Sequence, residues 1–231
     1  MPPAPLRRIL TVLRKRYGKP APPAAGRDPF ALILLEMVAY LSDDDTRRAA
    51  FEALRERVGL APSALLDTPL PVLTAICRSG GPVQPGERAK RMKLVAALAI
   101  DEFDGDLSRV LGWDYAKAVK ALRRFPSVAE PGADRILMLC GSHAVLGLDS
   151  NALRVLCRLG YGHETKNYTK TYRSSRDAAA AELPKKASSL AEASLLLREH
   201  GKETCKYTVP RCGECPLTAS CAWYRARART R

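Results

Sequence analysis

Four cysteines near the end of the chain constrain its fold more than any other feature. They are Cys205, Cys212, Cys215 and Cys221, in the spacing Cys-x6-Cys-x2-Cys-x5-Cys. Thiolates that converge on one point hold a tetrahedral metal ion or an iron–sulfur cluster. Structural zinc usually takes two close cysteine pairs separated by a longer stretch. One close pair flanked by two single cysteines therefore favours a [4Fe–4S] cluster, with zinc and a disulfide as the alternatives.

The charge of the chain indicates a polyanionic partner. The 231 residues include 38 Lys and Arg against 24 Asp and Glu, a formal net charge of +14, and such an excess is typical of nucleic-acid-binding proteins. Charge alone does not separate DNA from RNA or an anionic membrane. No apolar run reaches about 18 residues, so we expect no transmembrane helix. Nothing at the N-terminus resembles a signal peptide, so we expect a reducing, cytoplasmic compartment, with nucleoid association if the source is prokaryotic.

Apolar residues recur at helical spacing along most of the chain. One such stripe consists of Leu6, Ile9, Leu10 and Leu13. Residues 20–27 form a Pro- and Gly-rich connector, and the nearly uniform apolar character of residues 29–41 predicts a buried helix. Further helices are predicted over residues 45–58, 62–67, 70–78, 89–104, 106–110 and 114–123. Because no stretch alternates with a period of two, we predict an all-α fold.

A helix–turn–helix pattern precedes an acidic residue in the second half of the chain. The turn is FPSVAEPGA (residues 125–133), and a helix follows to about Cys140. After a short loop, Asp149 opens another helix that extends to Leu159. This order is the helix–hairpin–helix plus Gly/Pro–Asp arrangement.

Both motifs resemble those of one protein family. The segment HGKETCKYTVPRCGECPLTASC (residues 200–221) resembles the C-terminal cluster loop of endonuclease III and MutY-type DNA glycosylases. The turn and Asp149 resemble the helix–hairpin–helix of the same superfamily. The resemblance implies an all-α protein of two helical domains that binds a [4Fe–4S] cluster and double-stranded DNA.

The resemblance also implies where the two domains lie in the chain. A six-helix barrel that includes the helix–hairpin–helix would occupy residues 28–135. The cluster domain would combine residues 1–27 with 136–231, and its cluster loop would span 205–221.

The hairpin turn departs from the family pattern at two positions. The family has LPGVG, and its backbone N–H groups hold a DNA phosphate; this chain has FPSVA, in which Val128 is kept and Ser127 and Ala129 replace the glycines. Close backbone approach to a phosphate normally uses glycine. We therefore expect residues 127–129 to contact DNA but to anchor it more weakly.

Asp149 is the first candidate catalytic residue. An aspartate before a helix is often only an N-cap, because its carboxylate accepts backbone N–H bonds. The resemblance implies more: the carboxylate would stabilise the sugar cation that forms as the base leaves. Asn151 matches the Asp-x-Asn form of MutY and the thymine-mismatch glycosylases, and we expect it to contact DNA.

Position 131 separates the two reaction types of the family. Bifunctional members have a lysine there, 18 residues before the aspartate, whose amine forms a Schiff base with C1′. This chain has Pro131, which offers no nucleophile. We therefore expect no lyase activity, and expect Pro131 to contact DNA only.

Glu36 is the second candidate catalytic residue. It stands alone in the apolar segment PFALILLEMVAYL, where LLEMVAYLS resembles the LSEVMLQQT of MutY enzymes and their catalytic glutamate. An acid in an apolar pocket has a raised pKa and can protonate a departing base. The alternatives are a satisfied core glutamate or one turned to solvent.

The next residues along the chain would enter the DNA. Tyr40 and Leu41 replace the family's Gln-Gln or Ala-Gln pair, and a bulky apolar wedge can still fill the hole left by a flipped base. Asp44 fits the acidic helix cap that follows in the family.

These features together predict a monomeric, monofunctional DNA glycosylase that excises a mismatched or damaged base. One alternative is a bifunctional, endonuclease III-like glycosylase and AP lyase, which Pro131 opposes. Another is a catalytically inactive DNA-binding relative, which the changed turn and wedge favour. A zinc-binding nucleic-acid module is the third alternative.

Overall fold

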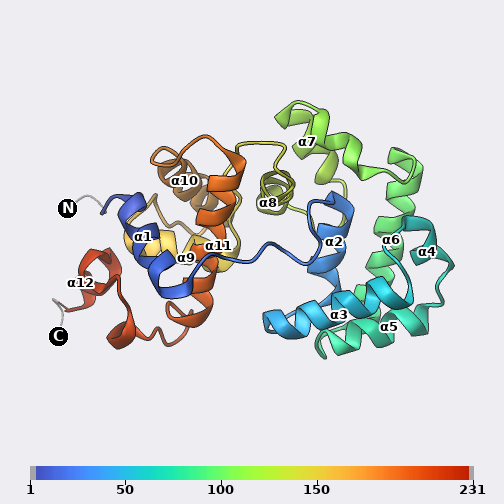
Figure 1. Ribbon diagram of the computed structural model, residues 1–231, viewed down its shortest axis with the longest axis horizontal. Coiled ribbons are helices and arrows are strands. Elements are labelled where there is room, and N and C mark those ends of the chain that lie inside the picture. Colours follow the sequence, from blue (N-terminus) through green and yellow to red (C-terminus); the bar gives the residue numbers. More distant parts are fainter. Residues whose placement is uncertain (1–3, 229–231) are drawn as a thin grey trace. The chain divides into compact units, whose positions relative to one another are not determined.

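The computed structural model describes residues 4–228, and every regular element in these residues is a helix (Figure 1). The all-α prediction is confirmed. None of the helices in this range is long and apolar enough to act as a membrane span.

The chain folds into two compact units. The central unit is Pro22–Ala129, and the terminal unit combines Met1–Ala21 with Glu130–Arg231. The sequence led us to expect boundaries at residues 28 and 135, so both boundaries of the folded units come slightly earlier in the chain. The later one coincides with the first residue of the helix that follows the hairpin turn.

The central unit is built from short helices around one buried helix. Its elements are α2 (Pro29–Val38), α3 (Asp44–Arg57), α4 (Pro62–Asp67), α5 (Leu70–Ser79), α6 (Pro85–Phe103), the 3-10 helix η1 (Leu107–Gly112) and α7 (Tyr115–Leu122). Helix α2 is buried along its length except at Glu36. It starts where Asp28 accepts a hydrogen bond from the Ala31 backbone N–H at 2.9 Å, with Pro29 in the first turn.

Helix α2 ends earlier than the apolar pattern predicted. The predicted end was residue 41, but Ala39 is extended and Leu41 has a positive φ of 53°. The chain turns here because the Tyr40 backbone N–H donates to the Gly80 carbonyl at 3.2 Å. A Cβ on Gly80 would lie 2.2 Å from the Val38 carbonyl oxygen, so the close approach requires glycine at that position.

Helix α6 begins earlier than predicted. We expected residues 82–86 to break the chain and the helix to begin at residue 89, yet Pro85 occupies its first turn, where proline is tolerated because that N–H has no helical partner. Arg88, one turn further on, is only 6% exposed. Its guanidinium donates to the carbonyls of Val38, Cys77, Gly81 and Val83.

The terminal unit places helices from both ends of the chain around one core. Its elements are α1 (Leu6–Tyr17), α8 (Glu130–Cys140), α9 (Ser150–Leu159), α10 (Tyr168–Ala180), α11 (Ala187–Glu203), the 3-10 helices η2 (Cys212–Glu214) and η3 (Thr218–Ser220), and α12 (Ala222–Ala228). The stripe on α1 buries Leu6, Ile9 and Leu13, while Leu10 is only partly buried. Helices α9 and α11 approach closely at Gly201, where a Cβ would lie 2.7 Å from the Asn151 carbonyl oxygen.

Candidate functional site

Asp149 is the N-cap of α9 in the terminal unit. Its Oδ1 atom accepts a hydrogen bond from the Ala152 backbone N–H at 2.8 Å. Its Oδ2 atom lies 3.1 Å from Nε of Arg198 on α11, and the Asn151 side-chain amide donates to it at 3.5 Å. Capping is therefore part of the role of Asp149, but it occupies only one of the two carboxylate oxygens.

A series of hydrogen bonds connects this carboxylate, through Asn151 and Arg154, with the cysteine loop. The Arg154 guanidinium donates to Asn151 Oδ1 and to the Gly201 carbonyl, both at 2.8 Å. Its Nε donates to the carbonyl of Cys205 at 3.0 Å. Helix α9 thus fixes Asn151 against both α11 and the start of the loop.

Residue 127 of the hairpin turn has a positive φ, a conformation that favours glycine, although the residue there is serine. The Val128 backbone N–H donates to the Phe125 carbonyl at 3.0 Å, and Ser127 adopts a φ of 71°. This left-handed conformation costs a non-glycine residue about 1–2 kcal/mol. Ser127 and Ala129 are exposed and Val128 is half-buried, so the turn presents its backbone to solvent although both family glycines are replaced.

Pro131 lies in the first turn of α8, which begins at Glu130. Proline at this position fits the helix start, and its side chain offers no amine. Position 131 therefore has the tertiary amide of proline, and no amine, where the resemblance would place the lysine of bifunctional enzymes.

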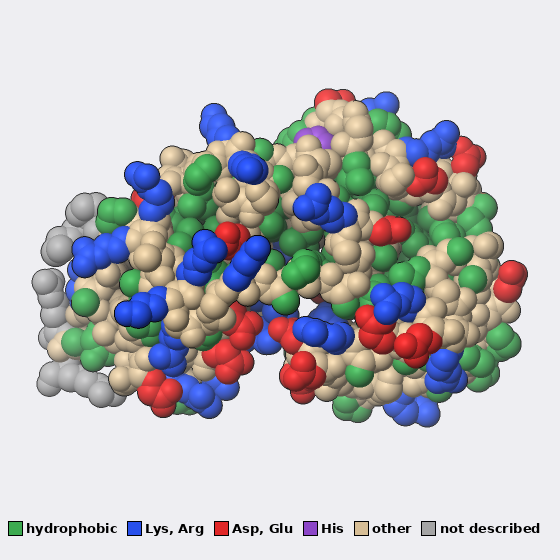
Figure 2. All heavy atoms as spheres, viewed as in Figure 1, with side chains coloured by type: hydrophobic (Ala, Val, Ile, Leu, Met, Phe, Trp, Pro, Cys, Tyr) green, Lys and Arg blue, Asp and Glu red, His purple; other side chains and the backbone are tan. Residues whose placement is uncertain are grey.

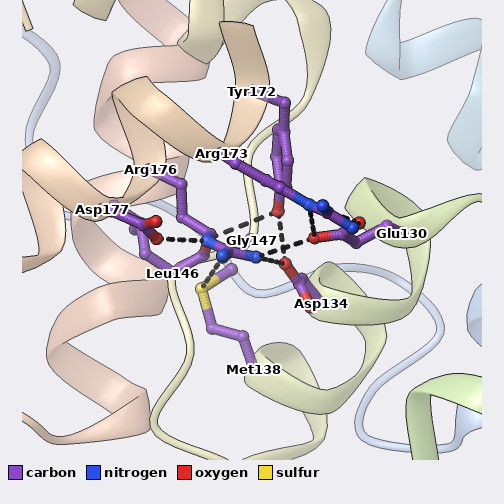
Figure 3. A network of polar contacts seen from close by, with 9 residues as sticks. All are labelled: Glu130, Asp134, Met138, Leu146, Gly147, Tyr172, Arg173, Arg176 and Asp177. Atoms are coloured by element: carbon purple, nitrogen blue, oxygen red, sulfur yellow. Dashed lines mark hydrogen bonds and ion pairs between the residues drawn. The ribbon is translucent and has the colours of Figure 1, made fainter. Parts of the chain in front are cut away.

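Ionic contacts hold the start of α8 against α10 (Figure 3). Glu130 receives the Arg173 guanidinium, with Nη2 to Oε2 at 2.6 Å. Asp134 is fully buried and accepts from the Tyr172 hydroxyl at 2.7 Å and from Arg176 Nη1 at 2.9 Å. Burial opposes the charge of Arg176, yet hydrogen bonds from its guanidinium to Asp177 and Asp134 raise its pKa above the usual range.

Glu36 does not lie in an apolar pocket, which corrects our expectation. Its side chain is 54% exposed and its Oε2 lies 3.3 Å from Nη1 of Arg47. The surrounding residues of α2 are buried on the other faces of the helix, so the apolar sequence indicated the helix core correctly but not the direction of Glu36. The carboxylate faces solvent beside an arginine.

Tyr40 and Leu41 project from the turn after α2. Their exposed fractions are 53% and 78%, which is large for apolar side chains. The turn is supported by Gly80 and Gly81 and by the buried guanidinium of Arg88. The following cap is Asp43, whose Oδ1 accepts from the Thr46 backbone N–H at 2.7 Å; Asp44, which we expected to be the cap, is the first helical residue.

The four cysteines of the loop line one cavity together with His200, Leu217 and Trp223. Three of the sulfurs accept N–H donors: Cys205 from Arg158 Nη1 at 3.3 Å, Cys215 from the Leu217 amide at 3.4 Å and Cys221 from the Tyr224 amide at 3.5 Å. All seven cysteines of the chain lie in the described region, and none of them forms a disulfide bond there.

The sulfurs share a cavity without forming a closed metal centre. Within residues 4–228, no three Cys, His, Asp or Glu side chains are arranged to hold a metal ion. Burial raises the pKa of the Cys215 and Cys221 thiols, and the other cysteines raise it further. A positive centre would reverse this effect and deprotonate them. Four soft ligands, with N–H donors directed at the sulfurs of Cys205, Cys215 and Cys221, fit an iron–sulfur group.

Comparison with known proteins agrees with this geometry. No protein-family model matches the sequence. Endonuclease III of Sulfolobus acidocaldarius is 28% identical over 205 residues, covering 86% of this chain and 83% of the relative. Endonuclease III of Thermotoga maritima is 22% identical over 202 residues, covering 87% and 86%.

Solved structures show the same fold. A non-covalent endonuclease III–DNA complex superposes with a TM-score of 0.77 at 20% identity, covering 97% of each chain. A thermostable thymine-DNA glycosylase gives a TM-score of 0.75 at 18% identity, covering 96% of this chain and 97% of the other. The chain therefore has the fold of these glycosylases, and its sequence is similar to that of the endonuclease III relatives. The resemblance stated from the sequence is thereby confirmed.

Several residues that contact the candidate residues had no signal in the sequence. In the terminal unit, Arg198 pairs with Asp149, and Tyr168 begins α10. Burial, and then the charge of Asp149, raise the pKa of Tyr168 above its usual value. In the central unit, Arg88 supports the turn at Tyr40. These residues are isolated along the chain, and only the packing of helices within each unit brings them to their partners.

The polyanionic partner that the net charge indicated agrees with the surface. Lys and Arg side chains are spread over both units on the face drawn in Figure 2, among fewer Asp and Glu side chains. With a net charge of +14, the chain has the electrostatic character that phosphate binding requires.

Proposed function

We propose that this protein is a monofunctional DNA glycosylase that excises a mismatched or damaged base in base-excision repair. The observation that carries the proposal is Asp149, held by the first turn of α9 through Oδ1, while its Oδ2 is not used by the cap and pairs with Arg198. Asn151 stands beside it, and Pro131 takes the place of the amine. The endonuclease III relatives support the reaction class.

Asp149 would act on the sugar rather than on the base. Breaking the N-glycosidic bond leaves positive charge on C1′ and the ring oxygen, and a nearby carboxylate lowers the energy of that charge. The cap bond from Ala152 fixes the carboxylate before the reaction, so little reorganisation is needed when the charge develops.

Glu36 would have a different role from the one expected. An exposed carboxylate beside Arg47 is suited to orienting a water molecule toward C1′, not to protonating the departing base. The proposal therefore keeps two carboxylates, Asp149 for the cation and Glu36 for the water.

Tyr40 and Leu41 would fill the space of the flipped nucleotide. Both are exposed on a turn whose backbone is fixed by Gly80 and Arg88, and a rigidly held apolar side chain can intercalate between bases. Residues 127–129 would contact the phosphate backbone through main-chain N–H groups.

The cysteine loop would hold a [4Fe–4S] cluster through Cys205, Cys212, Cys215 and Cys221. Bound there, the cluster supplies a cross-link for the loop. We expect purified protein to be brown and to contain about four irons per chain, measured by elemental analysis. Cys212→Ser should lower both the iron content and the unfolding midpoint. Stoichiometric zinc in place of iron would contradict this prediction.

The absence of a lysine at position 131 can be tested directly. Borohydride should trap no covalent complex between the wild-type protein and a duplex that carries its substrate base, because no Schiff base forms. Pro131→Lys should become trappable, since lysine is readily accommodated in the first turn of α8. Pro131→Ala, which removes the proline without adding an amine, is the matched control and should stay untrapped.

The same experiment separates the proposal from its alternative. The endonuclease III relatives favour a bifunctional enzyme, and an adduct with the wild-type protein would establish it. The substrate base itself is found by incubating the protein with duplexes that each contain one lesion or mismatch, followed by hot alkali. Cleavage only after alkali would support base release without lyase chemistry.

A further inference from the structure

The candidate catalytic carboxylate is engaged on both oxygens. Asp149 Oδ1 accepts the cap bond from the Ala152 N–H at 2.8 Å, and Oδ2 lies 3.1 Å from Arg198 Nε. The two side chains of the ion pair are only 16% and 20% exposed. A guanidinium this close offsets the negative charge that Asp149 would need to offer a sugar cation.

We propose that Arg198 exchanges Asp149 for a phosphate of bound DNA, so that binding of DNA unmasks the catalytic carboxylate. The inference rests on the proposed function, because it assigns Asp149 to the sugar of the target nucleotide. Arg198 is then a positioning residue: it offsets the charge of Asp149 in the free protein and leaves it when DNA binds.

A phosphate is a suitable second partner for this side chain. The phosphates that flank a nucleotide are bonded to the same sugar whose C1′ Asp149 would face, so they lie close to Arg198 when that sugar is in place. The planar guanidinium can bind phosphate oxygens with two hydrogen bonds, which makes the exchange favourable.

Asp149 would keep its position when Arg198 leaves. The cap bond from Ala152 does not involve Arg198, and the Asn151 amide lies 3.5 Å from Oδ2. The carboxylate therefore gains net charge without losing its orientation.

The other arginine beside Asn151 is fixed by the main chain. Arg154 donates to the carbonyls of Gly201 and Cys205 at 2.8 and 3.0 Å, and it would lose both bonds by turning to DNA. Arg198 instead pairs with a side chain whose charge the reaction requires. The ion pair with Asp149 assigns the exchange to Arg198.

The exchange is tested by a double-mutant cycle on DNA binding, without reference to catalysis. The probe is a duplex with one tetrahydrofuran abasic analogue, and its Kd is measured over a series of salt concentrations. Arg198→Ala should reduce the magnitude of the slope of log K against log salt by about 0.9, the value for one lost phosphate contact. Asp149→Asn should tighten binding up to about fivefold, because Arg198 no longer has a competing carboxylate.

The gain from Asp149→Asn should disappear in the Arg198→Ala background. Arg198→Lys, which keeps the charge, should keep most of the salt slope and protects the test if the alanine variant folds poorly. The matched control is the pair Arg14–Glu192 on the same unit, also 3.1 Å apart. Glu192→Gln removes the same charge and should tighten binding far less.

Each outcome of the cycle decides the proposal. An unchanged salt slope in Arg198→Ala and Arg198→Lys, or equal tightening by Asp149→Asn with and without Arg198, would show that the pair is only structural. A wild-type protein that does not bind the duplex would overturn the exchange together with the proposed function. Binding with the exchange but without base release from any lesion would support the exchange and overturn only the glycosylase.

Discussion

Replacing Asp149 by asparagine should slow base release about a thousandfold, the upper range for loss of one group that stabilises a transition state. The substitution keeps the shape of the side chain and removes its charge. Asparagine is as good an N-cap as aspartate, so the bond to the Ala152 N–H can persist. Because the charge acts only as the sugar cation develops, the loss should appear in the single-turnover rate and not as weaker binding of DNA.

A second capping aspartate provides the matched control. Asp114 starts α7 in the central unit, and its Oδ1 accepts from the Lys117 N–H at 3.0 Å. Asp114→Asn changes the same chemistry at the same helical position and should leave the rate within about twofold, because it removes no charge from the site. If Asp149→Asn lowered only the melting temperature and left the rate unchanged, Asp149 would be a cap and Glu36 would need another partner.

The fold class could be predicted because it depends on local patterns. Apolar residues at helical spacing and the absence of alternation indicated helices over most of the central unit, and the predicted start at residue 29 agrees with the start of α2. The end of α2 could not be predicted, because it is set by a hydrogen bond to Gly80, the residue that follows α5. Tertiary contacts of this kind override a favourable local sequence.

Only those parts of the candidate site whose residues lie close together in the sequence could be predicted. Position 149, the turn at 127–129 and the four cysteines follow from spacing. The ion pair between Asp149 and Arg198 joins two helices, and no sequence pattern connects such residues. The prediction for Glu36 failed for a different reason: we took an apolar segment to mean that every face of its helix is in apolar surroundings.

Ser127 shows that the residue type at one position did not predict the backbone conformation there. Glycine is favoured where φ is positive, yet the turn adopts a φ of 71° with serine. The hydrogen bond from the Val128 N–H to the Phe125 carbonyl and the two helices that flank the turn hold the chain in that conformation.

Removing the Arg176 side chain should destabilise the terminal unit by about 3–5 kcal/mol, the cost of leaving a buried charge without its partner. Asp134 is fully buried, and Arg176 is its cationic neighbour in the network between α8 and α10 (Figure 3). After Arg176→Ala, the Tyr172 hydroxyl would still donate to Asp134 at 2.7 Å, but a neutral donor compensates only part of the charge. Unfolding in urea measures the change.

The two tryptophans allow each unit to be followed separately. Trp113 lies in the central unit and Trp223 in the terminal unit, so a Trp113→Phe background makes the fluorescence of Trp223 report on the unit that contains Arg176. The matched control is Arg173→Ala, because Arg173 is 57% exposed and its partner Glu130 keeps the ion pair with Arg176. Its loss should cost less than about 1 kcal/mol.

The source of the destabilisation is tested by removing the charge as well. Asp134→Asn in the Arg176→Ala background should recover part of the lost stability, because a neutral amide is less costly to bury than an unpaired carboxylate. If the double variant were as unstable as the sum of the two single variants, the loss would come from packing of the long arginine side chain and not from the buried charge. Since this network holds the first turn of α8, where Pro131 follows the hairpin, the charge of Asp134 would then matter less for the site than the contact between the two helices.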